Sequence, residues 1–179
     1  RQMCIRDRLN VSFPRSTGNT PCFYNHFVTD REEPFDQPGT PEEPKGHYIF
    51  DKPEPLWNFG HGKSYTTFDY VDCALSDTLL AASDTLKVSV MIKNTGRCDG
   101  KEVVQLYVRD KVSTVATPIQ QLKAFQKVLV KSGESQCVEL SLPIAELALY
   151  NAKMEEVVEP GDFEIQIGAA SDDICLLYT

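Results

Sequence analysis

The most regular feature of the chain is an alternation of apolar and polar residues that begins near residue 66 and recurs in short segments. Leu86, Val88, Val90 and Ile92 show it first, each separated from the next by one residue. The later segments place their apolar residues at Val104, Leu106 and Val108, at Val138, Leu140 and Leu142, and at Phe163, Ile165 and Ile167. A period of two is typical of a β-strand with one face on a core.

Turn-forming residues separate these segments. They are Asn94-Thr95-Gly96, Asp99-Gly100, Lys131-Ser132-Gly133-Glu134 and Pro160-Gly161-Asp162. With a further strand over residues 125–130, this punctuation predicts an all-β fold, an immunoglobulin-like sandwich of about seven strands. Residues 163–167 are expected to form the last strand. Residues 145–149 are expected to form a single helical turn at a corner.

The first 65 residues lack this pattern. Pro14, Gly18 and Pro21 oppose a helix, so residues 10–25 are predicted to form a short strand followed by a turn-rich loop. Residues 29–65 are rich in proline and acidic residues and are predicted to be an extended connector. A connector of this length is uncommon inside a small domain, so we expect it to wrap a larger body that is absent from this chain.

Composition limits the classes of partner and cofactor that the chain is expected to bind. The chain has 26 acidic and 18 basic residues, a formal net charge of −8, so no basic field would recruit nucleic acid or an anionic membrane. Its six cysteines and three histidines are scattered without the spacing of a zinc site, which predicts reduced thiols and no metal or other cofactor. Three disulfides in a secreted protein are the alternative for the cysteines. A periplasmic or secreted location in a bacterium and a cytoplasmic one both stay open.

A family resemblance is carried by residues 55–70, Pro-Leu-Trp-Asn-Phe-Gly-His-Gly-Lys-Ser-Tyr-Thr-Thr-Phe-Asp-Tyr. This string resembles the "PFGHGLSYTTF" segment of family 3 glycoside hydrolases, the β-glucosidase and β-xylosidase group, where it leads into a fibronectin type III-like domain. Further matching segments are Val11-Ser12-Phe13-Pro14-Arg15-Ser16, Phe23-Tyr24-Asn25-His26, Glu102-Val103-Val104-Gln105-Leu106-Tyr107-Val108, Leu122-Lys123-Ala124-Phe125 and Val158-Glu159-Pro160-Gly161-Asp162-Phe163. The chain departs from the family at Lys63, usually leucine, and at Cys98, usually polar or charged.

The resemblance implies a division of the chain. Residues 1–28 would be the tail of an α/β-sandwich domain, 29–65 the connector, and 66–174 the fibronectin type III-like domain. Residues 1–8 and 175–179 are similar to translated adapter sequence, which indicates a non-native origin; an expression scar or a frayed terminus is the alternative. The chain would then be the C-terminal part of a β-glucosidase-like hydrolase.

The same resemblance implies that the chain is not catalytic by itself. The two carboxylates of the family lie upstream, so no catalytic residue is assigned here. The implied partners are the catalytic barrel and α/β domain of the same polypeptide, together with the oligo- or polysaccharide substrate of the parent enzyme. Dimerisation through the sandwich stays open.

Tyr24, Asn25 and His26 are the candidate binding residues, because by resemblance their polar loop approaches the rim of the substrate cleft. Aromatic faces stack on sugar rings, so Trp57, Tyr48 and Phe23 are further candidates. The structural interpretation is that these rings pin the connector and junction to a neighbouring domain. The alternative function is a free-standing carbohydrate- or protein-binding module.

Overall fold

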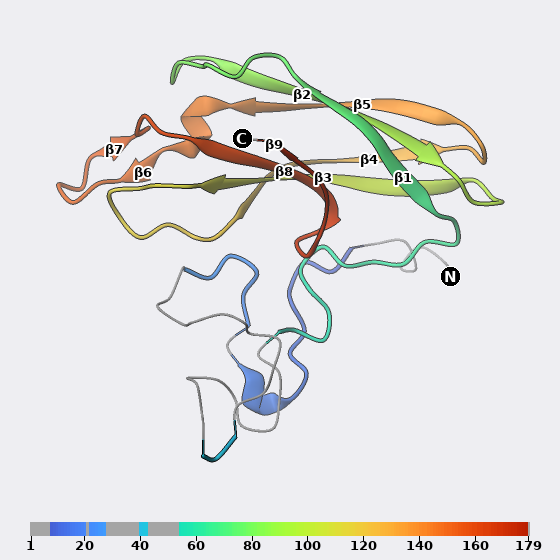
Figure 1. Cartoon of the computed structure of the whole chain (residues 1–179), viewed down its shortest axis with the longest axis horizontal. Helices are drawn as coiled ribbons and strands as arrows, with labels where there is room; N and C mark the ends of the chain where they lie inside the picture. Colours follow the sequence, from blue (N-terminus) through green and yellow to red (C-terminus); the bar gives the residue numbers. More distant parts are fainter. Residues whose placement is uncertain (1–7, 21, 28–39, 43–53, 179) are drawn as a thin grey trace.

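The computed structural model describes residues 8–20, 22–27, 40–42 and 54–178. Two antiparallel sheets face each other and enclose the core (Figure 1). The three-stranded sheet has the order β1-β2-β5, with bounds Phe68–Leu75, Thr85–Asn94 and Ser135–Pro143. The four-stranded sheet has the order β4-β3-β8-β9, with bounds Gln121–Val130, Gly100–Asp110, Phe163–Ala170 and Asp173–Tyr178. The seven strands of these two sheets confirm the predicted sandwich.

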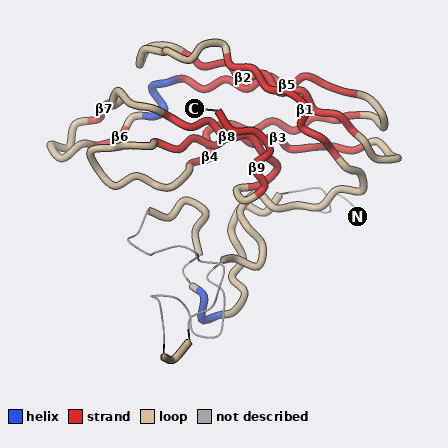
Figure 2. The backbone as a smooth tube through the Cα atoms, in the orientation of Figure 1, coloured by secondary structure: helices blue, strands red, loops and turns tan. Residues whose placement is uncertain are grey.

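A small hairpin closes one end of the sandwich (Figure 2). It pairs β6, Leu149–Tyr150, with β7, Glu156–Val157. The helical turn predicted for residues 145–149 is a 3-10 helix, η3, over Ile144–Leu147. A second 3-10 helix, η2, spans Thr17–Asn19.

The predicted periodicity places the core correctly. In β2, Val88, Val90 and Ile92 are fully buried, and Val104 and Leu106 of β3 meet them from the opposite sheet in the same apolar cluster. Full burial of each such side chain contributes about 1.5–3 kcal/mol to folding. The alternation in the sequence of β2 therefore reflects a strand that has one face buried in the core.

Two sequence predictions are wrong in detail. The strand over residues 163–167 is not the last, because β9 follows it and pairs with β8, with Leu176 opposite Ile167. Adjacent Leu176 and Leu177 break the alternation by which strands were recognised. Gly168 of β8 makes room for this return, since an added Cβ would overlap the carbonyl oxygen of Asp173.

The second error concerns residues 10–25. Among the described residues of this stretch, the predicted strand is reduced to one isolated bridge between Phe13 and Trp57, followed by η2. Prolines and turn residues leave no run long enough for a ladder. The origin of residues 1–8 and 175–179 stays a prediction.

The described residues 8–20, 22–27 and 54–62, here called the N-terminal lobe, lie beneath the four-stranded sheet (Figure 1). Their contact has a clear signature in β3, which is buried on both faces. Val104 and Leu106 face the core, while Gln105 and Tyr107, only 2% and 0% exposed, face the lobe. The outer face of this sheet is therefore a platform that the lobe covers.

Burial predicts the cost of truncating core side chains. Leu142→Ala removes a side chain that is 0% exposed, and we expect it to lower the free energy of unfolding by about 2–5 kcal/mol. Leu79→Ala is the matched control, because Leu79 is 88% exposed and should change stability by about 0.5 kcal/mol at most. Urea unfolding followed by circular dichroism measures both. Equal losses would contradict the assigned core.

Candidate functional site

The lobe is held together by backbone pairing of two segments far apart in sequence. The Leu9 amide donates to the His61 carbonyl at 2.9 Å, and the Gly60 amide donates back to Leu9 at 2.8 Å. Farther along, the Phe13 amide donates to the Trp57 carbonyl at 2.8 Å. Residues 9–13 and 56–61 therefore form one unit, and the bend near residue 60 is part of it.

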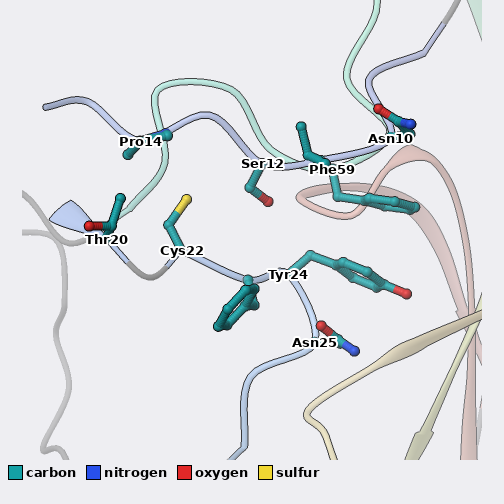
Figure 3. Close-up of a pocket in the computed structure, with 10 residues that line it drawn as sticks. Asn10, Ser12, Pro14, Thr20, Cys22, Tyr24, Asn25 and Phe59 are labelled. Atoms are coloured by element: carbon teal, nitrogen blue, oxygen red, sulfur yellow. The ribbon is translucent and has the colours of Figure 1, made fainter. Parts of the chain in front are cut away.

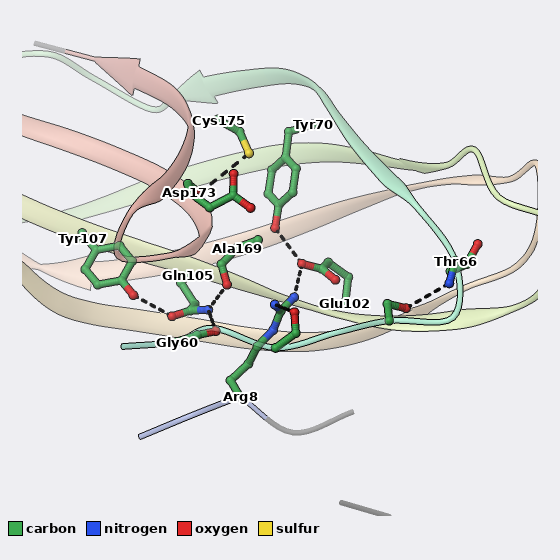
Figure 4. Close-up of polar contacts among 12 residues, drawn as sticks. Arg8, Gly60, Thr66, Tyr70, Glu102, Gln105, Tyr107, Ala169, Asp173 and Cys175 are labelled. Carbon is green, nitrogen blue, oxygen red and sulfur yellow. Dashed lines mark hydrogen bonds and ion pairs between the residues drawn. The ribbon is translucent and has the colours of Figure 1, made fainter. Parts of the chain in front are cut away.

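The bend lies at Gly60, whose φ of 81° is in the left-handed region that favours glycine. Gln105 fits tightly against it, since a Cβ on Gly60 would overlap Gln105 Oε1. Gln105 Nε2 donates to the carbonyls of Ala169 at 2.5 Å and Gly60 at 3.4 Å, while its Oε1 accepts from the Tyr107 hydroxyl at 2.7 Å (Figure 4). The buried polar pair on β3 is thereby satisfied by the bend and by β8.

Tyr24 lies between the lobe and the sheet. Its ring stacks on Phe59 with centroids 4.1 Å apart and an interplanar angle of 17° (Figure 3), and it meets Tyr107 edge-on at 6.0 Å. Its hydroxyl accepts the backbone N–H of Leu122 at 3.3 Å. Within this chain, Tyr24 is an anchor of the lobe on the platform.

Asn25 and His26 take different positions from Tyr24. Both are exposed, and the backbone of His26 rather than its ring contacts the sandwich, because its carbonyl accepts the Ile119 amide at 2.9 Å. His26 Nδ1 lies 3.0 Å from the Phe27 carbonyl oxygen. Of the three predicted residues, Tyr24 and Asn25 line one depression, whereas His26 is not part of its lining.

An open depression of about 380 Å³ lies beside Tyr24 in the lobe. Asn10, Ser12 and Asn25 supply polar groups to its lining, and Phe23 and Phe59 supply apolar surface (Figure 3). Phe23 is 63% exposed. Flat apolar rings beside amide groups are the chemistry that suits a sugar ring or a polar protein loop.

Trp57, a further predicted candidate, is not part of the lining of this depression. Trp57 packs edge-on against Phe13, with centroids 6.0 Å apart, and Tyr48 lies outside the described residues. Cys22, Cys73, Cys98, Cys137 and Cys175 carry free thiols, and Cys4 lies outside the described residues. Within the described ranges, no cluster of three or more potential metal ligands and no helix able to cross a membrane is found.

Sequence reasoning missed one ionisable group, Glu102. It is 3% exposed, and its Oε1 accepts from Arg8 Nη2 at 2.5 Å and from the Tyr70 hydroxyl at 3.2 Å. Burial raises the pKa of Glu102, and the charge of Arg8 acts against that rise. A signal existed, since Glu102 stands two residues before Val104 and so continues the core-facing side of its strand.

Comparison with known proteins decides the family. A model of the fibronectin type III-like domain matches residues 102–171. The chain is 40% identical over 169 residues to a β-xylosidase of Formosa agariphila, covering 93% of this chain and 22% of the relative. It is 37% identical over 167 residues to a periplasmic β-glucosidase of Salmonella typhimurium, covering 92% and 21%. The chain belongs to the C-terminal region of family 3 glycoside hydrolases.

Solved structures agree with this assignment. The β-glucosidase of Listeria innocua in complex with glucose superposes with a TM-score of 0.82 and 35% identity, over 96% of this chain and 23% of that one. The resemblance and the sandwich fold are thus confirmed. The family 3 segment spans about a fifth of the length of the relatives it matches.

The fit of Gly60 against Gln105 generates a stability prediction. Gly60→Ala should destabilise the chain by about 1–3 kcal/mol more than Gly133→Ala, because overpacking adds to the backbone strain. Gly133 is the matched control, with a φ of 77° and no atom within 4 Å of an added Cβ. Urea unfolding of both variants measures the difference. Equal costs would show that Gln105 yields without penalty.

Proposed function

We propose that this chain is the non-catalytic C-terminal part of a β-glucosidase- or β-xylosidase-like hydrolase that cleaves O-glycosyl bonds. Its sandwich serves as a platform that braces the domains carrying the catalytic carboxylates. The observation that carries the proposal is the outer face of the four-stranded sheet, where Tyr24, Gly60 and Gln105 seat the lobe. The confirmed family membership supports the reaction class.

The platform has a chemical purpose. Glycoside hydrolysis depends on groups held to within fractions of an ångström of their working positions, and a loop reaches that precision only when its base is fixed. Tyr24 fixes the start of its loop to the sheet through one ring stack, one edge-on ring contact and one hydrogen bond. The residues beside it are then presented from a rigid support.

Asn25 and His26 are proposed to reach the rim of the substrate cleft from this support, with Tyr24 as the residue that positions them. The exposure of both side chains supports a role toward the rest of the enzyme. An exposed amide can donate to and accept from sugar hydroxyls. Residues 1–28 belong, in this proposal, to the end of the α/β domain.

The rim proposal is tested in the intact hydrolase. Tyr24→Ala removes the stack and should lower kcat/KM about tenfold or more through misplaced rim groups. Tyr24→Phe is the control, because it keeps the ring and loses only the acceptor for the Leu122 amide. Steady-state kinetics on aryl glucosides and xylosides provide the readout. Unchanged kcat and KM in Tyr24→Ala would remove these residues from the rim.

The alternative, a free-standing binding module, makes a different prediction for the isolated chain. If the chain is a bracing part of a hydrolase and not a carbohydrate-binding module, the 179-residue chain should migrate at the same rate in native gels with and without β-glucan or xylan. Bovine serum albumin provides the reference mobility. Specific retardation by either polysaccharide, abolished by Phe23→Ala, would favour the binding module.

A further inference from the structure

Glu102 is an ionisable side chain on the core-facing side of β3, at the edge where the two sheets and the lobe meet (Figure 4). A buried carboxylate is costly unless it is paired and hydrogen-bonded. Here the pairing comes from outside the sandwich. Arg8 belongs to the lobe, and among the described residues the Tyr70 hydroxyl on β1 donates the other hydrogen bond to this carboxylate.

Arg8 connects three parts of the molecule. Its Nη2 reaches Glu102 at 2.5 Å, and its Nη1 donates to the Gly62 carbonyl at 3.3 Å, just past the bend. The next residue, Leu9, pairs with Gly60 and His61. The Arg8 side chain is 17% exposed and therefore lies largely out of water at the point where the lobe contacts the sandwich.

The other groups that face Glu102 do not replace this cation. Tyr70 on β1 is a neutral donor, because burial and then the charge of Glu102 hold its pKa well above the usual range. Asp173 on β9 is a carboxylate that raises the pKa of Glu102. Burial raises the pKa of Cys175, also on β9, to about 11, so its thiol is neutral at neutral pH. Arg8 supplies the positive charge among the described groups that face this carboxylate.

We propose that Glu102 is a positioning residue, a buried carboxylate socket in the sandwich that takes a cationic side chain from the lobe and thereby holds the lobe on the platform. This inference rests on the proposed bracing function and names the chemistry of its contact. In this chain the cationic side chain is that of Arg8. Binding of the lobe is then coupled to the ionisation of one carboxylate.

The pH dependence follows from the direction of the shift. Since burial raises the pKa of folded Glu102 above its unfolded value, its contribution to stability is present in acid and is lost as the pH rises through the folded pKa. Removing Arg8 raises that folded pKa further. The loss caused by removing Arg8 should therefore be small when Glu102 is protonated and largest when it is ionised.

The test uses the 179-residue chain and its single tryptophan, Trp57, which lies in the lobe and reports on it separately from the sandwich. Thermal transitions are followed by Trp57 fluorescence for the lobe and by circular dichroism for the strands. Arg8→Met should lower the midpoint temperature of the Trp57 transition by roughly 5–10 °C at about pH 8, and by much less at about pH 4. Arg8→Lys keeps the positive charge, so its midpoint temperature should stay close to that of the wild type.

Two controls separate the socket from a general charge effect. Arg97→Met removes an exposed arginine from the loop after β2 and should give a small difference that does not grow with pH. Glu102→Gln should abolish the pH-dependent part of the Arg8→Met effect, because the amide has no charge to compensate. A difference between wild type and Arg8→Met that is the same at every pH, or that survives in Glu102→Gln, would overturn the proposal.

The outcome also distinguishes this proposal from the platform itself. If Gly60→Ala loosens the lobe while Arg8→Met behaves like Arg97→Met, the platform stands and the socket falls. If neither variant changes the Trp57 transition, the lobe does not depend on the sheet, and both proposals fail. Recovery of the Arg8→Met variant in acid shows that its chain folds.

Discussion

The structure depends on the burial of polar side chains on the outer face of the four-stranded sheet. Gln105 and Tyr107 of β3 point away from the hydrophobic core, yet both are shielded from water. Buried amides and hydroxyls are stable only with hydrogen-bond partners, and these come from Gly60, Ala169 and each other. Gly60 is the partner that comes from the lobe, which therefore both covers this face and completes its hydrogen bonding.

This requirement explains how far sequence reasoning could reach. The core of β2 is visible in the sequence because one face of the strand meets the core and the other meets water, which leaves a period of two. β3 also has apolar residues on its core-facing side. Its outward residues, however, are buried by a segment 45 positions earlier in the chain, as in the contact of Gln105 with Gly60. No local pattern encodes that cover. In β9 burial does alternate, but the apolar Cys175 and Leu177 on its exposed side hide that period in the sequence.

The candidate site shows the same division between local and distant information. Tyr24 could be recognised as important from the segment around it, but the rings that hold it, Phe59 and Tyr107, belong to a bend and a strand far along the chain. Glu102 carried a local signal, a charge in line with apolar residues of its strand. Its partner Arg8 lies 94 positions away, and sequence periodicity does not connect the two. Polar contacts between distant segments thus define how the lobe binds the sandwich, whereas the spacing of apolar residues along the chain defines the sandwich itself.

The close approach at Gly168 has a consequence for how this domain can change over evolution. The carbonyl of Asp173 occupies the volume that a side chain at position 168 would need. Because Gly168 has no Cβ, β9 can begin at Asp173 directly beside β8. A side chain at position 168 would displace the start of β9, so the route of the last strand depends on a glycine in the strand before it.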